Sequence, residues 1–137
     1  MKYLYQTVRR YPLSSLLIGV IWYLSFFTPP KTELDNVAFI DKWVHVVMYG
    51  GTCAVIWAEY IRRHRVAAPR EFRFAVRRKL FLLAWLAPIV MSGVIELLQE
   101  YCTDGRRSGD WLDLAANATG VTLAAVAGML FFWRKIF

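Results

Sequence analysis

The sequence predicts an all-α fold, a bundle of four transmembrane helices with both termini in the cytoplasm. The 137-residue chain contains four apolar runs, and each is long enough to cross a hydrocarbon layer of about 30 Å as a helix. The apolar fraction of 58% and the mean hydropathy of +0.37 exceed what soluble globular domains show. The length suits a single domain, residues 1–137, and is too short for two.

The four helices are expected at about residues 12–28, 43–61, 80–99 and 110–133. Pro12 is tolerated in a first helical turn, and Pro29-Pro30 end the first helix because proline donates no backbone hydrogen bond. Pro88 lies inside the third run and predicts a kink there.

The connection between the second and third helices, residues 62–79, carries eight of the seventeen Lys and Arg residues. Phe72 and Phe74 lie among these charges, which is typical of an amphipathic stretch resting on an anionic membrane surface. We therefore expect no nucleic-acid binding, although the net charge is +7.

The basic residues also orient the chain. If the N-terminus is cytoplasmic, that side of the membrane holds thirteen Lys and Arg residues and the opposite side holds four. Lys and Arg are enriched in cytoplasmic loops, so the loops at 31–42 and 100–110 are expected outside. This distribution predicts a multi-pass membrane protein with both termini in the cytoplasm.

Small residues recur at every fourth position in two of the predicted helices. Such spacing lets helix backbones approach closely inside a bilayer, and it predicts that the second and fourth helices are neighbours. The residues are Gly50, Ala54 and Ala58 in the second helix, and Ala116, Gly120, Ala124 and Gly128 in the fourth.

Polar side chains gather at matching ends of three helices. Ionisable groups inside a membrane segment are costly, so they usually pair, meet water or serve a function. Because successive helices alternate in direction, all of these residues are expected at the extracytoplasmic face. They are Asp41 and His45 at the start of the second helix, Glu96 and Gln99 at the end of the third, and Asp110, Asp113 and Asn117 at the start of the fourth.

Several of these residues also have an ordinary structural interpretation. Asp41 and Asp110 lie where an acidic side chain commonly caps a helix. A lone histidine such as His45 is more often a hydrogen-bonded bundle residue than a ligand. Glu96 lies inside an apolar run and needs a basic partner, a cation or a proton. Arg106 or Arg107 is the expected basic partner.

The order of these residues resembles that of the VanZ-like membrane protein family over roughly residues 15–133. The motif consists of Asp41-Lys42-x-x-His45, then Glu96-x-x-Gln99, then an arginine, then Asp113-x-x-x-Asn117-x-x-Gly120. The arginine corresponds to either Arg106 or Arg107. The family is named after a protein linked to teicoplanin resistance. The resemblance therefore implies a multi-pass protein of the inner (cytoplasmic) membrane of a bacterium, with a cell-envelope role and a link to glycopeptide antibiotics. This chain is shorter than that member.

Three functions are compatible with the sequence. In the first, the site binds an anionic lipid or a lipid-linked cell-wall intermediate. Lys42, Arg106 and Arg107 would bind its phosphate. The ligand site then comprises the following residues: Asp41, Lys42, His45, Glu96, Gln99, Arg106, Arg107, Asp113 and Asn117.

In the second, the protein is an intramembrane hydrolase or transferase acting on such a lipid, with His45, Glu96 and Asp113 as candidate catalytic residues. Converging Asp41, Glu96 and Asp113 could then hold a divalent cation. In the third, the residues form a structural ion-pair network in a partner subunit. We assign no resident metal or cofactor, expect membrane lipids as partners, and leave a homo-oligomer open.

Overall fold

The computed structural model describes residues 1–27, 33–36, 39–64, 70–105 and 109–136, which form helices joined by short turns and contain no strand. Three helical segments are long and apolar enough to cross a membrane, which is typical of a multi-pass membrane protein. They are Ile40–Arg63, Ala75–Cys102 and Trp111–Phe132. A shorter apolar helix, Pro12–Phe26, accompanies them. That this helix is a fourth span, and that both termini are cytoplasmic, stay predictions.

The helices follow one another with few other elements. They are α1 (Lys2–Arg10), α2 (Pro12–Phe26), α3 (Ile40–Arg63), α4 (Arg70–Phe81), α5 (Ala87–Cys102) and α6 (Trp111–Ile136), with a 3-10 turn η1 (Glu33–Asn36) and a π-helical turn η2 (Leu82–Leu86).

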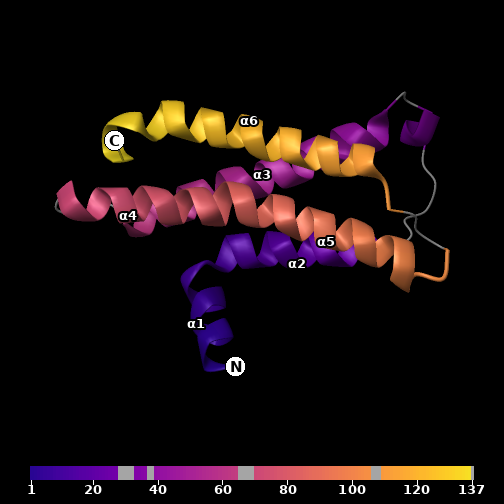
Figure 1. Cartoon of the computed structure of the whole chain (residues 1–137), viewed down its shortest axis with the longest axis horizontal. Coiled ribbons are helices and arrows are strands. Elements are labelled where there is room, and N and C mark those ends of the chain that lie inside the picture. Colours follow the sequence, from indigo (N-terminus) through magenta and orange to yellow (C-terminus); the bar gives the residue numbers. More distant parts are fainter. Residues whose placement is uncertain (28–32, 37–38, 65–69, 106–108, 137) are drawn as a thin grey trace.

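Helices α2, α3, α5 and α6 lie alongside one another and alternate in direction (Figure 1). At the left end of Figure 1, α2 begins, α3 ends, α4 begins and α6 ends. At the right end, α2 ends, α3 begins, α5 ends and α6 begins. The helix ends that carry the predicted polar residues therefore lie on the same side of the molecule.

Two helical segments lie outside the four predicted spans, and the second of them falls in the stretch that was predicted to be amphipathic. The amphipathic helix α1 precedes α2 and buries no side chain. The second half of the basic connection forms α4, which continues through η2 into α5. The apolar runs alone did not mark these segments because both are rich in charge.

The helix around Pro88 shows a π-helical turn at the place where a kink was expected. Within η2 the Ala87 backbone N–H donates to the Leu82 carbonyl, a longer reach than in an α-helix. Pro88 follows immediately, in the first turn of α5, and is buried. Proline cannot continue the α-helical ladder, and the wider turn before it accommodates the missing donor.

Helices α3 and α6 make the closest contact of the fold, as the small residues predicted. A Cβ atom added to Gly50 would lie 3.0 Å from the Gly120 carbonyl oxygen, and one added to Gly120 would overlap the Val46 carbonyl oxygen. Further along, Gly128 lies against the Trp57 indole, where an added Cβ would come within 2.6 Å. Two backbones therefore touch directly at Gly50 and Gly120.

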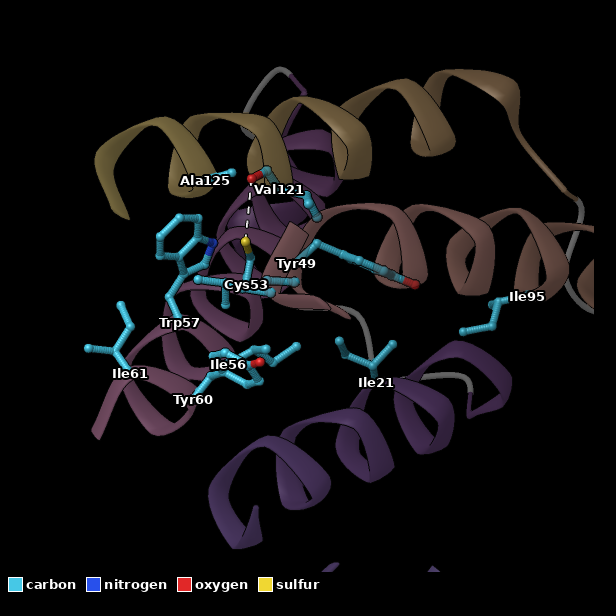
Figure 2. Packing of buried hydrophobic residues seen from close by; sticks show 12 residues of the cluster. Ile21, Tyr49, Cys53, Ile56, Trp57, Tyr60, Ile61, Ile95, Val121 and Ala125 are labelled. Carbon is cyan, nitrogen blue, oxygen red and sulfur yellow. Dashed lines mark hydrogen bonds between the residues drawn. The ribbon is translucent and has the colours of Figure 1, made fainter. Parts of the chain in front are cut away.

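The stripe predicted for α3 is correct only at Gly50. Ala54 and Ala58 are exposed, whereas Cys53 and Trp57 are buried and face α6 (Figure 2). The Cys53 thiol donates a weak hydrogen bond of 3.5 Å to the Val121 carbonyl oxygen. The contact surface of α3 thus combines a glycine with larger side chains that fill the space further along.

Candidate polar site at the ends of three helices

Helices α3, α5 and α6 bring His45, Glu96 and Asp113 together. One nitrogen or oxygen atom from each of the three side chains lies within 4.8 Å of the others. His45 and Asp113 are partly exposed, and Glu96 is buried. The sequence placed these three residues at one membrane face, and the structure gathers them into a single cluster, which we call the triad.

His45 is held in one ring orientation by α6. Its Nδ1 atom lies 2.8 Å from the Asn117 side-chain oxygen, and the Asn117 amide nitrogen donates to the Ser92 hydroxyl at 2.6 Å. In this amide orientation the Asn117 oxygen can only accept, so Nδ1 of His45 carries the proton. The other ring nitrogen, Nε2, faces an Asp113 oxygen at 3.6 Å, too far for a hydrogen bond.

Lys42 is committed to three carboxylates. Its ammonium group lies 2.8 Å from Asp41 and 2.9 Å from Asp110, and it also binds Oδ1 of Asp113. The ammonium group of Lys42 holds the pKa of the Asp110 carboxyl below its usual range. Lys42 therefore balances negative charge that the protein itself supplies, instead of standing free to bind phosphate as the sequence suggested.

Glu96 combines deep burial with few partners. Only 6% of the residue is exposed, and Oε2 accepts a hydrogen bond of 2.9 Å from the Asp110 backbone N–H. Its other oxygen accepts no hydrogen bond from any residue that the structure describes. A Cβ atom on Gly109 would overlap the Glu96 carbonyl oxygen, so a glycine at 109 permits the close approach that delivers the Asp110 N–H.

A cavity of about 270 Å³ lies next to Glu96. Three carboxyl side chains face an apolar and aromatic wall in its lining. The lining residues are Glu96, Leu97, Glu100, Tyr101, Gly109, Asp110 and Trp111. Three of these described lining residues, Glu96, Glu100 and Asp110, carry carboxyl groups.

The remaining predicted residues have clear positions. The expected N-cap at Asp41 is wrong: α3 begins at Ile40 after Phe39, with no side-chain cap, and the exposed Asp41 side chain pairs with Lys42. Asp110 does cap α6, since its Oδ1 accepts the Leu112 N–H at 2.8 Å. Asp41 also stays outside the triad, and His45 takes the place foreseen for it beside Glu96 and Asp113.

Gln99 connects α5 to α2. Its side-chain nitrogen donates to the Ser25 backbone carbonyl at 2.6 Å, and the residue is buried. Its role as a ligand residue stays a prediction, as does that of Arg106 and Arg107, which lie outside the described residues.

Two polar residues of importance were missed in the sequence. Ser92 lies one helical turn before Glu96 and holds Asn117, a spacing that the sequence could have shown. Glu59, near the opposite end of α3, is buried and accepts three hydrogen bonds from the start of α2. Glu59 lies near the end of an apolar run and close to the basic connection at residues 62–79, so its burial was not evident from the sequence.

A scan against protein-family models matches no family, and searches of curated proteins and of solved structures find no match. The resemblance to the VanZ-like family therefore stays a prediction that rests on the motif alone.

Proposed function

We propose that this chain is a VanZ-like protein of the bacterial inner membrane that recognises the headgroup of an anionic lipid or of a lipid-linked cell-wall intermediate at its extracytoplasmic face. In this proposal α2 is a fourth, short span. Its 15 residues extend about 22 Å, which local thinning of the bilayer can accommodate. The excess of Lys and Arg on the side of the two termini and the 62–79 connection supports an orientation with that side in the cytoplasm.

One observation carries the proposal: the cavity beside Glu96 has an apolar rim that is itself exposed. Leu97, Tyr101 and Trp111 line the cavity and are all exposed on the surface of the protein. Tyr and Trp are enriched where a membrane protein meets the headgroup region. A lipid could therefore reach Glu96 sideways from the outer leaflet, with its chains against the aromatic rim and its headgroup among the polar side chains.

The motif residues support a shared site, because Lys42, His45, Asp113 and Asn117 all take part in one connected set of contacts. In the proposal, Arg106 and Arg107 bind the phosphate, since Lys42 is occupied by carboxylates. A link to glycopeptide resistance follows only if the lipid is a cell-wall intermediate, and it is measured by the change in teicoplanin susceptibility on deletion and re-expression.

Photocrosslinking in native membranes tests the proposal. A photoreactive amino acid at Trp111, on the cavity rim, is expected to capture a phosphate-containing lipid. The same amino acid at Phe131, exposed on the same helix but far from the cavity, serves as the matched control. Equal capture from both positions, or none from position 111, contradicts the proposal.

The orientation of His45 favours a second candidate function, an intramembrane hydrolase or transferase acting on the same lipid. A ring with protonated Nδ1 presents Nε2 towards the Asp113 carboxylate, with Glu96 in the same cluster, an arrangement suited to general acid–base catalysis. The purified protein would then turn over the captured lipid, and both His45→Ala and Asp113→Ala would abolish turnover. Turnover that survives both substitutions rules this candidate out.

A further inference from the structure

We infer that His45, Glu96 and Asp113 bind one divalent transition-metal ion, Zn²⁺ or Mn²⁺, and that this ion turns an acidic site into one that accepts phosphate oxygen. The metal site stands on the geometry of the triad alone. Its role towards phosphate rests on the proposed function.

The triad has the spacing of a metal site that needs little adjustment. One ligand atom from each residue lies within 4.8 Å of the others, and the His45 Nε2 and Asp113 Oδ2 atoms are 3.6 Å apart. Metal–ligand bonds of about 2.0–2.2 Å hold neighbouring ligand atoms about 3–4 Å apart in tetrahedral and octahedral sites. The widest of these separations, at most 4.8 Å, needs to shorten by about 1–2 Å to reach that spacing.

Each triad residue is held from behind by another group. Asn117 accepts from Nδ1 of His45, the Asp110 N–H donates to Oε2 of Glu96, and Lys42 binds Oδ1 of Asp113. The second atoms of His45 and Asp113, Nε2 and Oδ2, then lie 3.6 Å from each other. Metal ligands in proteins are commonly oriented by such outer contacts. A purely structural network would instead use the remaining atoms for direct hydrogen bonds.

The charges at this end of the molecule favour a cation. Among the described residues, four carboxylates meet one ammonium group, that of Lys42. These carboxylates belong to Asp41, Asp110, Asp113 and Glu96. Two carboxylates gathered this closely at the edge of a bilayer repel each other, and one divalent ion between Glu96 and Asp113 would balance this pair.

The ligand types select the metal. An imidazole with two carboxylates suits Zn²⁺ or Mn²⁺, whereas Ca²⁺ and Mg²⁺ prefer sites built from oxygen alone. Three protein ligands leave at least one coordination position open, as in zinc sites that bind a water or a substrate. Since Glu96 also lines the cavity, an open position on that side meets a phosphate oxygen of the headgroup.

Titration of the purified protein with metal tests the site in the absence of lipid. The protein carries an affinity tag without histidine, is stripped with EDTA, and is titrated with Zn²⁺, Mn²⁺, Mg²⁺ and Ca²⁺ by calorimetry. We expect one equivalent of Zn²⁺ or Mn²⁺ and much weaker binding of Mg²⁺ and Ca²⁺. Absence of Zn²⁺ and Mn²⁺ binding overturns the inference.

Variants locate the ion. His45→Gln and Glu96→Gln are expected to weaken binding by more than about 100-fold, since losing a group that only orients a ligand costs about 10- to 100-fold. Glu100→Gln, a carboxylate of the same cavity outside the triad, is expected to bind as the parent does. Nitrogen hyperfine coupling in the Mn²⁺ electron paramagnetic resonance spectrum, lost in His45→Gln, reports the imidazole directly. Binding or coupling that is unchanged in His45→Gln overturns the site.

A lipid experiment separates the two proposals. Capture at position 111 is repeated in nanodiscs of phosphatidylglycerol, with Zn²⁺ or with EDTA, and with inorganic phosphate as a soluble competitor. Capture that needs Zn²⁺ supports the bridging role, and competition by phosphate shows that the phosphate group is the part recognised. Capture that is equal in EDTA overturns the bridging role and leaves lipid recognition standing. Metal binding without any lipid capture overturns the proposed function alone.

Discussion

Two buried glutamates, one towards each end of the molecule, differ in how they are satisfied. Glu59 is 7% exposed and Glu96 is 6% exposed. Glu59 accepts hydrogen bonds from the Leu13 N–H at 3.1 Å, the Ser14 N–H at 3.0 Å and the Ser14 hydroxyl at 2.6 Å. Glu96 accepts a single one among the described residues and lies beside a cavity and two other triad residues.

The difference separates a carboxylate that serves the fold from one that serves a ligand. Leu13 and Ser14 are in the first turn of α2, whose N–H groups have no partner inside their own helix. Glu59 supplies that partner from α3, and its negative charge suits the positive end of the α2 dipole. Among the described residues Glu96 accepts one backbone hydrogen bond instead of three, and its carboxylate lies beside His45 and Asp113.

The largest effect on stability is expected when the contact between α3 and α6 is disrupted. Gly120→Ala places a methyl group on the Val46 carbonyl oxygen and should separate α3 from α6, at a cost of about 1–3 kcal/mol or more. Gly51→Ala is the matched control because an added Cβ there meets nothing within 4 Å. Thermal unfolding in detergent measures both. Equal melting temperatures would contradict the close helix contact.

A second substitution removes the side chain that orients His45. Asn117→Leu keeps the size of the side chain and leaves Nδ1 of His45 and the Ser92 hydroxyl without their partner. A buried polar group without a partner costs about 1–3 kcal/mol. We also expect Zn²⁺ affinity to fall about 10- to 100-fold, since His45 loses its fixed orientation. Unchanged affinity would show that Asn117 does not position the histidine.

A third substitution removes one of the three hydrogen bonds that Glu59 accepts. Ser14→Ala removes the 2.6 Å hydrogen bond to Glu59 and leaves both backbone bonds in place. We expect a loss of about 0.5–1.5 kcal/mol in the free energy of unfolding, with no change in metal binding. Ser15→Ala is the control because the neighbouring serine makes no such bond to Glu59. A drop in metal affinity would contradict the independence of the two ends.

The smallest expected effect is a dependence on pH at the start of α6. The pKa of Asp110 is lower in the folded protein than in the unfolded chain, since Lys42 and the Leu112 N–H favour the charged form. Its contribution to stability is therefore complete above the ordinary aspartate pKa of about 4. It is lost as the pH falls below that value through the folded pKa. Asp110→Asn should flatten this part of the curve of melting temperature against pH.

Sequence patterns were sufficient for the four apolar helices and for the side of the molecule on which the polar residues meet, but the apolar runs did not mark α1 and α4. Apolar runs set α2, α3, α5 and α6, and the glycines at 50 and 120 indicated which helices touch. The pairing of individual side chains depends on helix rotation, which spacing alone does not fix. Lys42 thus turned out to bind three carboxylates, and His45 rather than Asp41 completes the triad.

The most direct test of the central claim compares Glu59→Gln with Glu96→Gln in metal-free detergent solution. We predict that Glu59→Gln loses about 1–3 kcal/mol of unfolding free energy, because an uncharged amide is a weaker acceptor for three donors. Glu96→Gln should be as stable as the parent or more so, because the amide oxygen still accepts the Asp110 N–H and a buried charge is gone. With Zn²⁺ added, the parent should gain stability and Glu96→Gln should not. A loss in Glu96→Gln equal to that in Glu59→Gln would show that Glu96 serves the fold and would contradict the account.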